Sequence, residues 1–139
     1  MKIAGLFLGI CLFSFTAMSA DLSLLEEAAL LGTMGGLAEV CGENSKKLSD
    51  YELIAARLIA NKADSEKEEV RGYRRYAEEK ATAIRRQKNK PQMSCAEVVS
   101  RFEKMSIFKS VVYSDGSLKL SDGTFLKAKR PPLGLKKNK

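Results

Sequence analysis

Residues 94–102, SCAEVVSRF, contain the signals that decide the predicted fold. Ser94 followed by Glu97 is a capping box, in which each of the two side chains accepts a hydrogen bond from the other residue's backbone N–H at a helix start. Cys95 lies in the first turn of this predicted helix, so its partner determines which part of the chain lies beside it. The apolar residues that follow have helical spacing and would line one face: Val98, Val99, Phe102, Met105 and Phe108.

The N-terminal residues have the pattern of a secretory signal peptide. Lys2 supplies a positive charge, residues 3–15 are almost wholly apolar, and residues 17–19 offer small side chains where a signal peptidase requires them. We therefore predict that residues 1–19 are a cleaved signal and that a periplasmic or secreted chain begins near Ala20. An uncleaved membrane anchor is disfavoured because the apolar run is shorter than the roughly 20 residues that span a bilayer.

Removal of the signal peptide leaves two cysteines, Cys41 and Cys95. In an oxidising compartment they most simply form one structural disulfide, which would stabilise the fold by roughly 4 kcal/mol on the chain-entropy model. A redox pair is disfavoured because there is no C-x-x-C motif, and metal binding is disfavoured because the chain has no histidine. Cys11 does not fit a lipoprotein signal, since Ile10 stands where a small residue is needed.

Three further helices are predicted ahead of this one. The first extends from Leu24 to about Gly42, with apolar residues at helical spacing and a glycine at its end. Gly32, Gly35 and Gly36 interrupt this segment, and each is less favourable in a helix than alanine. These glycines either let another helix approach closely or divide the segment into two, and both alternatives stay open.

Capping boxes mark the other two helices. The box at residues 49–52 predicts a helix that continues to about Asn61, and the box at residues 65–68 predicts a long polar helix to about Asn89. Acidic residues at the start of the long helix and basic residues at its end complement the helix dipole. Its narrow apolar stripe consists of Val70, Tyr73, Ala77, Ala81 and Ile84.

An arginine cluster lies on the long predicted helix, at Arg71, Arg74 and Arg75. Glu78 and Glu79 lie within one turn of the cluster. The favoured interpretation is therefore a solvated face whose charges pair with one another. The alternative is a docking patch for an anionic partner.

After the last helix, the apolar period changes from helical to alternating. The phrase S-D-G occurs twice, and Asp-Gly is favoured in two-residue hairpin turns, which require positive backbone φ angles. We therefore predict three short strands joined by tight turns at 115–116 and 122–123. The face formed by Leu118, Leu120 and Phe125 is expected to pack on the helices, because an isolated hairpin is only marginally stable.

The predicted fold class is mainly α. A small disulfide-stapled bundle of about four helices would span residues 20–108, a short β-hairpin or meander residues 109–128, and a basic disordered tail residues 129–139. The disulfide is expected to join the first helix to the last and to enclose the middle pair. Such a staple suits a small domain with a thin, alanine-rich core.

The excess positive charge is concentrated at the C-terminal end. Residues 21–108 contain 15 basic and 15 acidic residues, whereas residues 109–139 contain 8 basic residues and only Asp115 and Asp122 as acids. The net charge of the whole chain is +7. A contact surface for an anionic partner is therefore expected in the C-terminal part.

No catalytic, cofactor or metal site is predicted. The sequence has no histidine, no nucleophile elbow, no phosphate-binding loop and no zinc-binding spacing. Adjacent glutamates occur at 26–27, 68–69 and 78–79, but neighbouring residues on a helix point in different directions. Asp115 and Asp122 do not have the spacing of a calcium-binding EF-hand loop. These features together predict that the protein is not an enzyme.

The favoured function is that of a small exported interaction protein, such as an adaptor, an accessory subunit of an envelope or secretion assembly, or an immunity-type inhibitor. Its partner would be a protein of the cell envelope; no small-molecule substrate is expected, and nucleic acid is disfavoured by the secretory route. Partner contacts are predicted in the hairpin and tail, at Leu118, Leu120, Phe125, Lys127, Lys129, Arg130, Lys136, Lys137 and Lys139.

Other hypotheses compete with this one. The basic tail would bind a polyanion, either an anionic membrane surface or nucleic acid, with a strong dependence on salt; alternatively it only keeps the protein soluble. A chaperone-like role would use apolar surface exposed by opening of the glycine-interrupted first helix. An enzyme of unfamiliar type is the least favoured.

Overall fold

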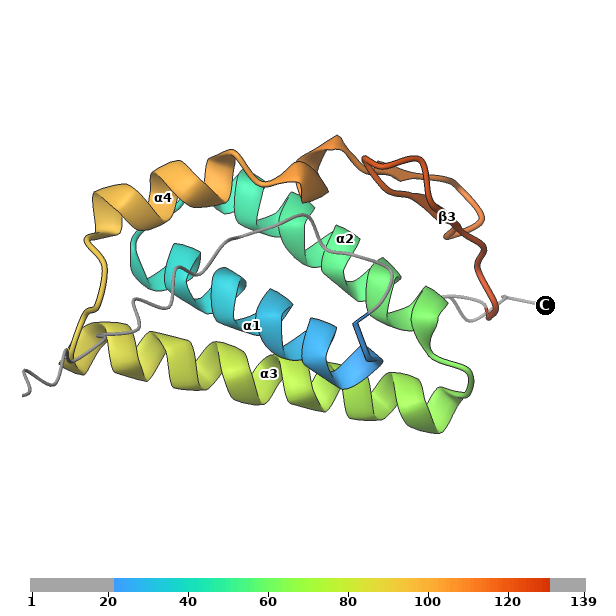
Figure 1. The fold of residues 1–139 in the computed structure, drawn as a ribbon, viewed down its shortest axis with the longest axis horizontal. Helices are drawn as coiled ribbons and strands as arrows, with labels where there is room; N and C mark the ends of the chain where they lie inside the picture. Colours follow the sequence, from blue (N-terminus) through green and yellow to red (C-terminus); the bar gives the residue numbers. More distant parts are fainter. Residues whose placement is uncertain (1–21, 131–139) are drawn as a thin grey trace, which may run out of the picture.

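The computed structural model describes residues 22–130 of the 139-residue chain, so the predicted signal peptide lies outside the described residues. The described part is mainly helical and carries a small antiparallel sheet after the helices (Figure 1). The predicted fold class is confirmed. The elements are α1 (Leu24–Val40), α2 (Ser45–Lys62), α3 (Glu66–Asn89), α4 (Cys95–Glu103), the 3₁₀ turn η1 (Ser106–Lys109), β1 (Val111–Val112), β2 (Leu118–Lys119) and β3 (Phe125–Leu126).

Helix α1 is the central helix of the bundle. It runs without interruption through its three glycines and packs against α2, α3 and α4 (Figure 1). Its apolar side chains surround the helix instead of forming one stripe, as expected for a helix that is buried on several sides. The disulfide therefore does not enclose a middle pair between two outer helices, as predicted, because the first helix itself lies inside.

Two of these glycines set the distance between α1 and α3. A Cβ atom at Gly32 would lie 2.2 Å from the carbonyl oxygen of Tyr76, and one at Gly36 would lie 2.5 Å from that of Lys80. Because Gly32 and Gly36 are four residues apart, they share one side of α1. Of the two alternatives that the sequence leaves open, the structure shows close helix approach.

Helix α3 buries the predicted stripe only in part, since Tyr73 packs against the core whereas three other members face solvent. Val70 is 44% exposed, and Ala77 and Ala81 are exposed as well. The close contact with α1 explains the difference, because packing at this distance requires backbone and short side chains at the contact instead of a stripe of larger apolar groups. The residues that α3 buries are Glu69, Gly72 and Ala83.

The predicted starts of α3 and α4 are confirmed, whereas that of α2 is wrong. In α3 and α4 the hydroxyl of the N-cap serine, Ser65 or Ser94, accepts a hydrogen bond from the backbone N–H three residues later. Helix α2 begins about one turn before the predicted box at 49–52. The Asn44 side chain caps it there, by accepting hydrogen bonds from two backbone N–H groups of the first turn.

The Cys41–Cys95 disulfide joins helix ends, as predicted. Cys41 is the C-terminal cap of α1 and Cys95 is the first residue of α4, and their Cα atoms are 5.0 Å apart. Gln87 of α3 lies beside them, with its Nε2 3.7 Å from the Cys41 sulfur and donating to the Met93 carbonyl at 2.8 Å. The disulfide therefore holds α1 and α4 against the C-terminal end of α3.

An aromatic cluster connects α2, α4 and η1. The ring centroid of Phe102 lies 4.9 Å from that of Tyr51 and 5.2 Å from that of Phe108. Phe108, predicted on the last helix, lies in η1 because α4 already ends at Glu103. The hydroxyl of the fully buried Tyr51 donates to the Leu31 carbonyl at 2.6 Å, so this polar group has a partner in the core.

Each Asp-Gly turn is one residue longer than predicted. The N–H of Gly116 donates to the Tyr113 carbonyl, and the N–H of Tyr113 donates to the Ser117 carbonyl, which encloses a three-residue loop. Gly116 has a positive φ of 88°, but Asp115 does not. The Asp115 carboxylate instead accepts a hydrogen bond from the Ser117 N–H at 2.8 Å, an arrangement by which aspartate stabilises a turn. The turn at Gly123, with φ 90°, has the same backbone pattern.

The longer loops reverse the predicted orientation of Phe125. Paired residues on neighbouring strands share a face, and a shift of one residue moves a side chain to the opposite face. A two-residue turn would pair Phe125 with Leu120, whereas Phe125 pairs with Lys119 and is 55% exposed. Leu118 pairs with Leu126, and Leu118 and Leu120 belong to the core. The predicted packing on the helices is correct for Leu118 and Leu120 and wrong for Phe125.

Replacement of Gly32 by alanine tests the contact between α1 and α3. Alanine would favour an isolated helix by about 1 kcal/mol, but its Cβ would collide with the backbone of Tyr76. We expect a net loss of about 2 kcal/mol in the free energy of unfolding, measured by urea denaturation. Gly42→Ala is the matched control, because a Cβ atom at Gly42 would meet no other atom. Gly42 has φ 81°, so the alanine should lower the free energy of unfolding by about 1 kcal/mol through backbone strain alone. Stabilisation by Gly32→Ala would contradict the close contact.

Candidate interaction surfaces

The last turn of α2 connects the helices to the sheet. The Asn61 side chain is buried, and its Nδ2 donates to the Gly116 carbonyl at 2.9 Å and to the Leu126 carbonyl at 3.2 Å. These carbonyls belong to the first turn and to the last strand. One amide group therefore fixes the first turn and the last strand of the sheet against α2.

The neighbouring Lys62 forms a buried ion pair with Glu27 of α1. Burial raises the pKa of the Glu27 carboxyl above its ordinary value, and the hydrogen bond and positive charge of Lys62 oppose this rise. The second carboxylate oxygen of Glu27, Oε1, has no hydrogen-bond partner among the described residues. The pair joins α1 to α2 but is only partly satisfied, so its net contribution to stability is small.

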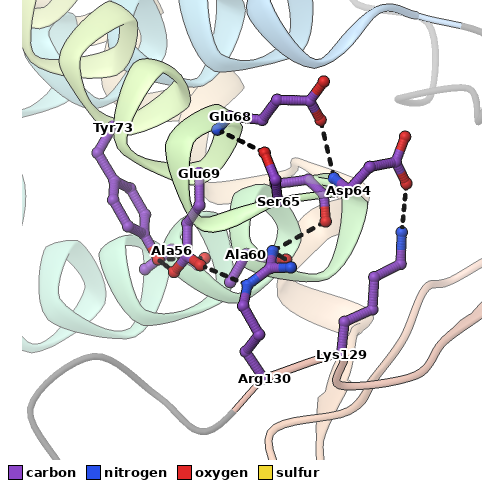
Figure 2. A network of polar contacts seen from close by, with 10 residues as sticks. Ala56, Ala60, Asp64, Ser65, Glu68, Glu69, Tyr73, Lys129 and Arg130 are labelled. Carbon is purple, nitrogen blue, oxygen red and sulfur yellow. Dashed lines mark hydrogen bonds and ion pairs between the residues drawn. The ribbon is translucent and has the colours of Figure 1, made fainter.

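Arg130 closes the same end of α2 from the C-terminal segment (Figure 2). Its Nη2 donates to the carbonyl oxygens of Ala60 at 3.1 Å and Ala63 at 2.8 Å, where the helix dipole favours a cation. Its Nε donates to Glu69 of α3 at 3.1 Å. Glu69 is only 3% exposed, and its other oxygen accepts a hydrogen bond from the Tyr73 hydroxyl at 2.8 Å. Arg130 thus neutralises a buried carboxylate and caps a helix at once.

The described part of the predicted tail is therefore attached to the bundle. Lys129 forms an ion pair with Asp64 at 2.9 Å, beside the Arg130 contacts (Figure 2). The hydrogen bond and charge of Lys129 lower the pKa of Asp64, although that carboxylate is exposed. The prediction of a flexible tail from residue 129 is thus corrected for Lys129 and Arg130. The predicted contact residues Lys136, Lys137 and Lys139 lie outside the described residues.

The side of the sheet that faces away from the helices carries two exposed aromatic side chains, Tyr113 and Phe125. Phe125 is 55% exposed and Tyr113 43%, and their rings contact each other with centroids 5.7 Å apart. Val111 is 50% exposed and pairs with Lys119, which in turn pairs with Phe125. We call this surface the outer sheet face. It consists of Val111, Tyr113, Lys119, Phe125 and Lys127, all of them exposed.

The structure divides the six predicted contact residues that it describes into three groups. Leu118 and Leu120 are buried in the core, so their side chains are not accessible to a partner in the folded protein. Lys129 and Arg130 contact carboxylates of the bundle. Of the predicted contact residues within 22–130, Phe125 and Lys127 lie on the outer sheet face, together with Val111, Tyr113 and Lys119, which the sequence analysis did not select. The alternation of these residues along each strand was visible, but their face depends on the loop length.

The described residues show no further candidate for chemistry. Residues 22–130 contain no group of three or more histidine, cysteine, aspartate or glutamate side chains that would bind a metal. None of the helices in this range is long and apolar enough to cross a membrane. A small pocket of about 20 Å³ lies beside Ser110 and Leu120. A larger surface pocket is lined, among the described residues, by side chains of α3 alone. The prediction that the protein is not an enzyme stays a prediction.

Comparison with known proteins identifies no relative. No protein-family model matches the chain, and no curated protein or solved structure is detectably similar to it. Function is therefore argued from the surfaces described above.

Replacement of Arg130 by alanine tests its role at the end of α2. The variant leaves Glu69 buried without its cation and exposes the helix end, so we expect a loss of about 3 kcal/mol in the free energy of unfolding. The adjacent Lys129→Ala is the control, because its partner Asp64 is exposed, and it should cost less than about 0.5 kcal/mol. Equal effects of the two substitutions in urea denaturation would show that Arg130 is no more than a surface residue.

The raised pKa of Glu27 has a defined effect on the pH dependence of stability. The folded protein holds this proton more tightly than the unfolded chain, so the contribution is fully present below the ordinary pKa of 4.5 and is lost as the pH rises through the folded value. Relative to Glu27→Gln, the unsubstituted protein should therefore lose stability as the pH rises, measured by urea denaturation.

The neighbouring Glu26 provides a control of opposite sign. Hydrogen bonds from Ser23 lower its pKa, so its contribution is present above the ordinary pKa and is lost as the pH falls through the folded value. A Glu26→Gln series should therefore show the reverse trend. Parallel trends in the two series would contradict the assignment of the pH dependence to the burial of Glu27.

Proposed function

We propose that this chain is a small exported, non-enzymatic interaction protein that binds a partner protein of the cell envelope through the outer sheet face. The observation that supports the proposal is the exposed Tyr113–Phe125 pair with Val111 beside it. Aromatic side chains are enriched at the centres of protein interfaces, where they contribute much of the binding free energy. A small sheet with exposed aromatic side chains on one face is therefore suited to docking a partner protein.

The partner is expected to present acidic side chains around an apolar centre. Lys119 lies in register between Val111 and Phe125, and Lys127 follows two residues after Phe125 on the same side. In addition, residues 109–139 contain 8 basic and 2 acidic residues. Charges at the rim of an interface increase the association rate and select partners of opposite charge.

The sheet is held in one position before any partner binds. Asn61 fixes its first turn and last strand, and Arg130 holds the segment that follows β3. A surface that is already ordered loses less conformational entropy on binding. This supports a role for the sheet as a rigid docking element.

The compartment is part of the proposal. The Cys41–Cys95 disulfide is consistent with an oxidising compartment, where such bonds persist. Export itself is proposed from the predicted signal at residues 1–19. The competing hypotheses have less support: Gly32 and Gly36 are packed against α3, which removes the feature that favoured a chaperone-like opening, and two of the six predicted tail cations contact the bundle.

The double substitution of Tyr113 and Phe125 by serine tests the docking surface. The mature protein is used to capture partners from the envelope fraction, and each captured protein is then purified and its affinity measured. We expect the double variant to lose at least about 100-fold in affinity, since central interface aromatics commonly contribute 2 kcal/mol or more each.

Leu53→Ser is the matched control, because Leu53 is 51% exposed on α2 and is also a large apolar side chain. It should leave the affinity unchanged. Equal loss in the two variants, or none in either, would refute the outer sheet face as the docking site. Mass spectrometry of the captured bait also shows whether its N-terminus has been processed.

A further inference from the structure

Helix α3 presents a row of cations on its solvent side. Lys67, Arg74 and Arg85 are separated by 7 and 11 residues, spacings that return to the same side of a helix. Arg71 and Lys88 flank this row, and all five side chains are exposed. From the first to the last of them the row extends over roughly 30 Å of helix. We call this surface the basic face of α3: Lys67, Arg71, Arg74, Arg85 and Lys88.

The cations of the basic face outnumber the acids that lie among them. The exposed Glu78 follows Arg74 by four residues and shares this side of α3, so the face combines five positive charges with one negative charge. Within residues 22–130, no carboxylate oxygen lies within the 4.0 Å of an ion pair from any of the five. Other cations of the same helix are paired: Arg75 with Glu79 at 3.0 Å, and Lys80 with two glutamates at 2.6 Å each. The interpretation of the arginine cluster as a self-paired face therefore holds for Arg75 and not for Arg71 or Arg74.

Exposed apolar side chains lie among these cations. Val70 is 44% exposed, and Ala77 and Ala81 are exposed on the same side of the helix. The two tyrosines of α3, Tyr73 and Tyr76, lie toward the bundle, so the basic face has no aromatic ring on which a nucleic-acid base would stack. Small apolar groups between cations, on a helix face without aromatic residues, suit contact with lipid head groups.

We propose that the basic face of α3 binds the surface of an anionic phospholipid bilayer. The cations would contact the lipid phosphates, and Val70 with the two alanines would lie at the head-group level. In Figure 1, α3 forms the edge of the bundle opposite α4, and the sheet lies beyond the far end of α4. A protein bound in this way would leave the outer sheet face free for its partner. This inference does not rest on the docking role of the sheet.

Sedimentation with phospholipid vesicles tests the proposal. The mature protein is mixed with vesicles of phosphatidylcholine alone or with added phosphatidylglycerol. We expect binding only with phosphatidylglycerol, and release at high salt, because screening weakens contacts between exposed charges. The triple variant Lys67→Gln, Arg71→Gln and Arg74→Gln should bind roughly 100-fold more weakly, since each basic residue contributes on the order of 1 kcal/mol at an anionic surface.

A charge-matched control separates the basic face from net charge. Lys104→Gln, Lys119→Gln and Lys127→Gln removes the same number of exposed cations elsewhere and should reduce binding much less. A variant truncated after Arg130 tests the basic tail in the same way. Urea denaturation confirms that each variant is folded, which is expected because all the replaced side chains are exposed.

Three results would overturn the proposal. The first is that the unsubstituted protein does not sediment with phosphatidylglycerol vesicles. The second is equal loss of binding in the control and the α3 variant, which would make the effect one of net charge. The third is that truncation after Arg130 abolishes binding while the α3 variant retains it, which would assign the membrane contact to the tail. Binding to duplex DNA without binding to the vesicles would also overturn the proposal.

Discussion

The backbone contact between α1 and α3 is the constraint on which the rest of the structure depends. Because Gly32 and Gly36 have no side chains, α3 lies directly against α1, and α1 becomes the centre of the bundle. This placement brings the Nζ atom of Lys80 in α3 to 2.6 Å from a carboxylate oxygen of Glu39 in α1 and from one of Glu52 in α2. One cation therefore joins three helices. The same placement also leaves Val70, Ala77 and Ala81 of the predicted stripe in solvent, while Tyr73 packs against the core.

The last turn of α2 sets the position of the sheet by polar contacts. Apolar packing of Leu118 and Leu126 on the bundle is favourable but tolerates small displacements, because the hydrophobic effect is not directional. The hydrogen bonds of Asn61 and Arg130 do not tolerate them, since a buried group that loses its partner costs about 1–3 kcal/mol. The core therefore supplies affinity between the sheet and the helices, and these hydrogen bonds supply the orientation that leaves Phe125 and Tyr113 in solvent.

Local signals predicted those features that local contacts decide. The caps at Ser65 and Ser94 and the three-stranded sheet follow from short patterns, and the Cys41–Cys95 disulfide, which joins residues 54 apart, follows from the cysteine count. The errors arose where two local solutions compete and a distant contact chooses between them. A loop of two or three residues satisfies the same S-D-G phrase, but the choice moves Phe125 from one face of the sheet to the other. The contact between Arg130 and Glu69 joins positions 61 residues apart, and no periodicity in either segment indicates it.

Charge counting along the chain did not indicate the cations that gather on α3, for a related physical reason. Residues 21–108 are electrically balanced, yet their acids are not distributed evenly over the surface. Lys80 uses two glutamates at one seam, and Asp64 and Glu69 pair with Lys129 and Arg130 from outside this segment. Acids that form these pairs no longer offset the cations that face solvent, so an electrically neutral segment folds with an excess of cations on the basic face of α3. The field that a partner meets is set by which charges remain unpaired after folding, and α3 therefore carries a positive surface that counting along the sequence did not indicate.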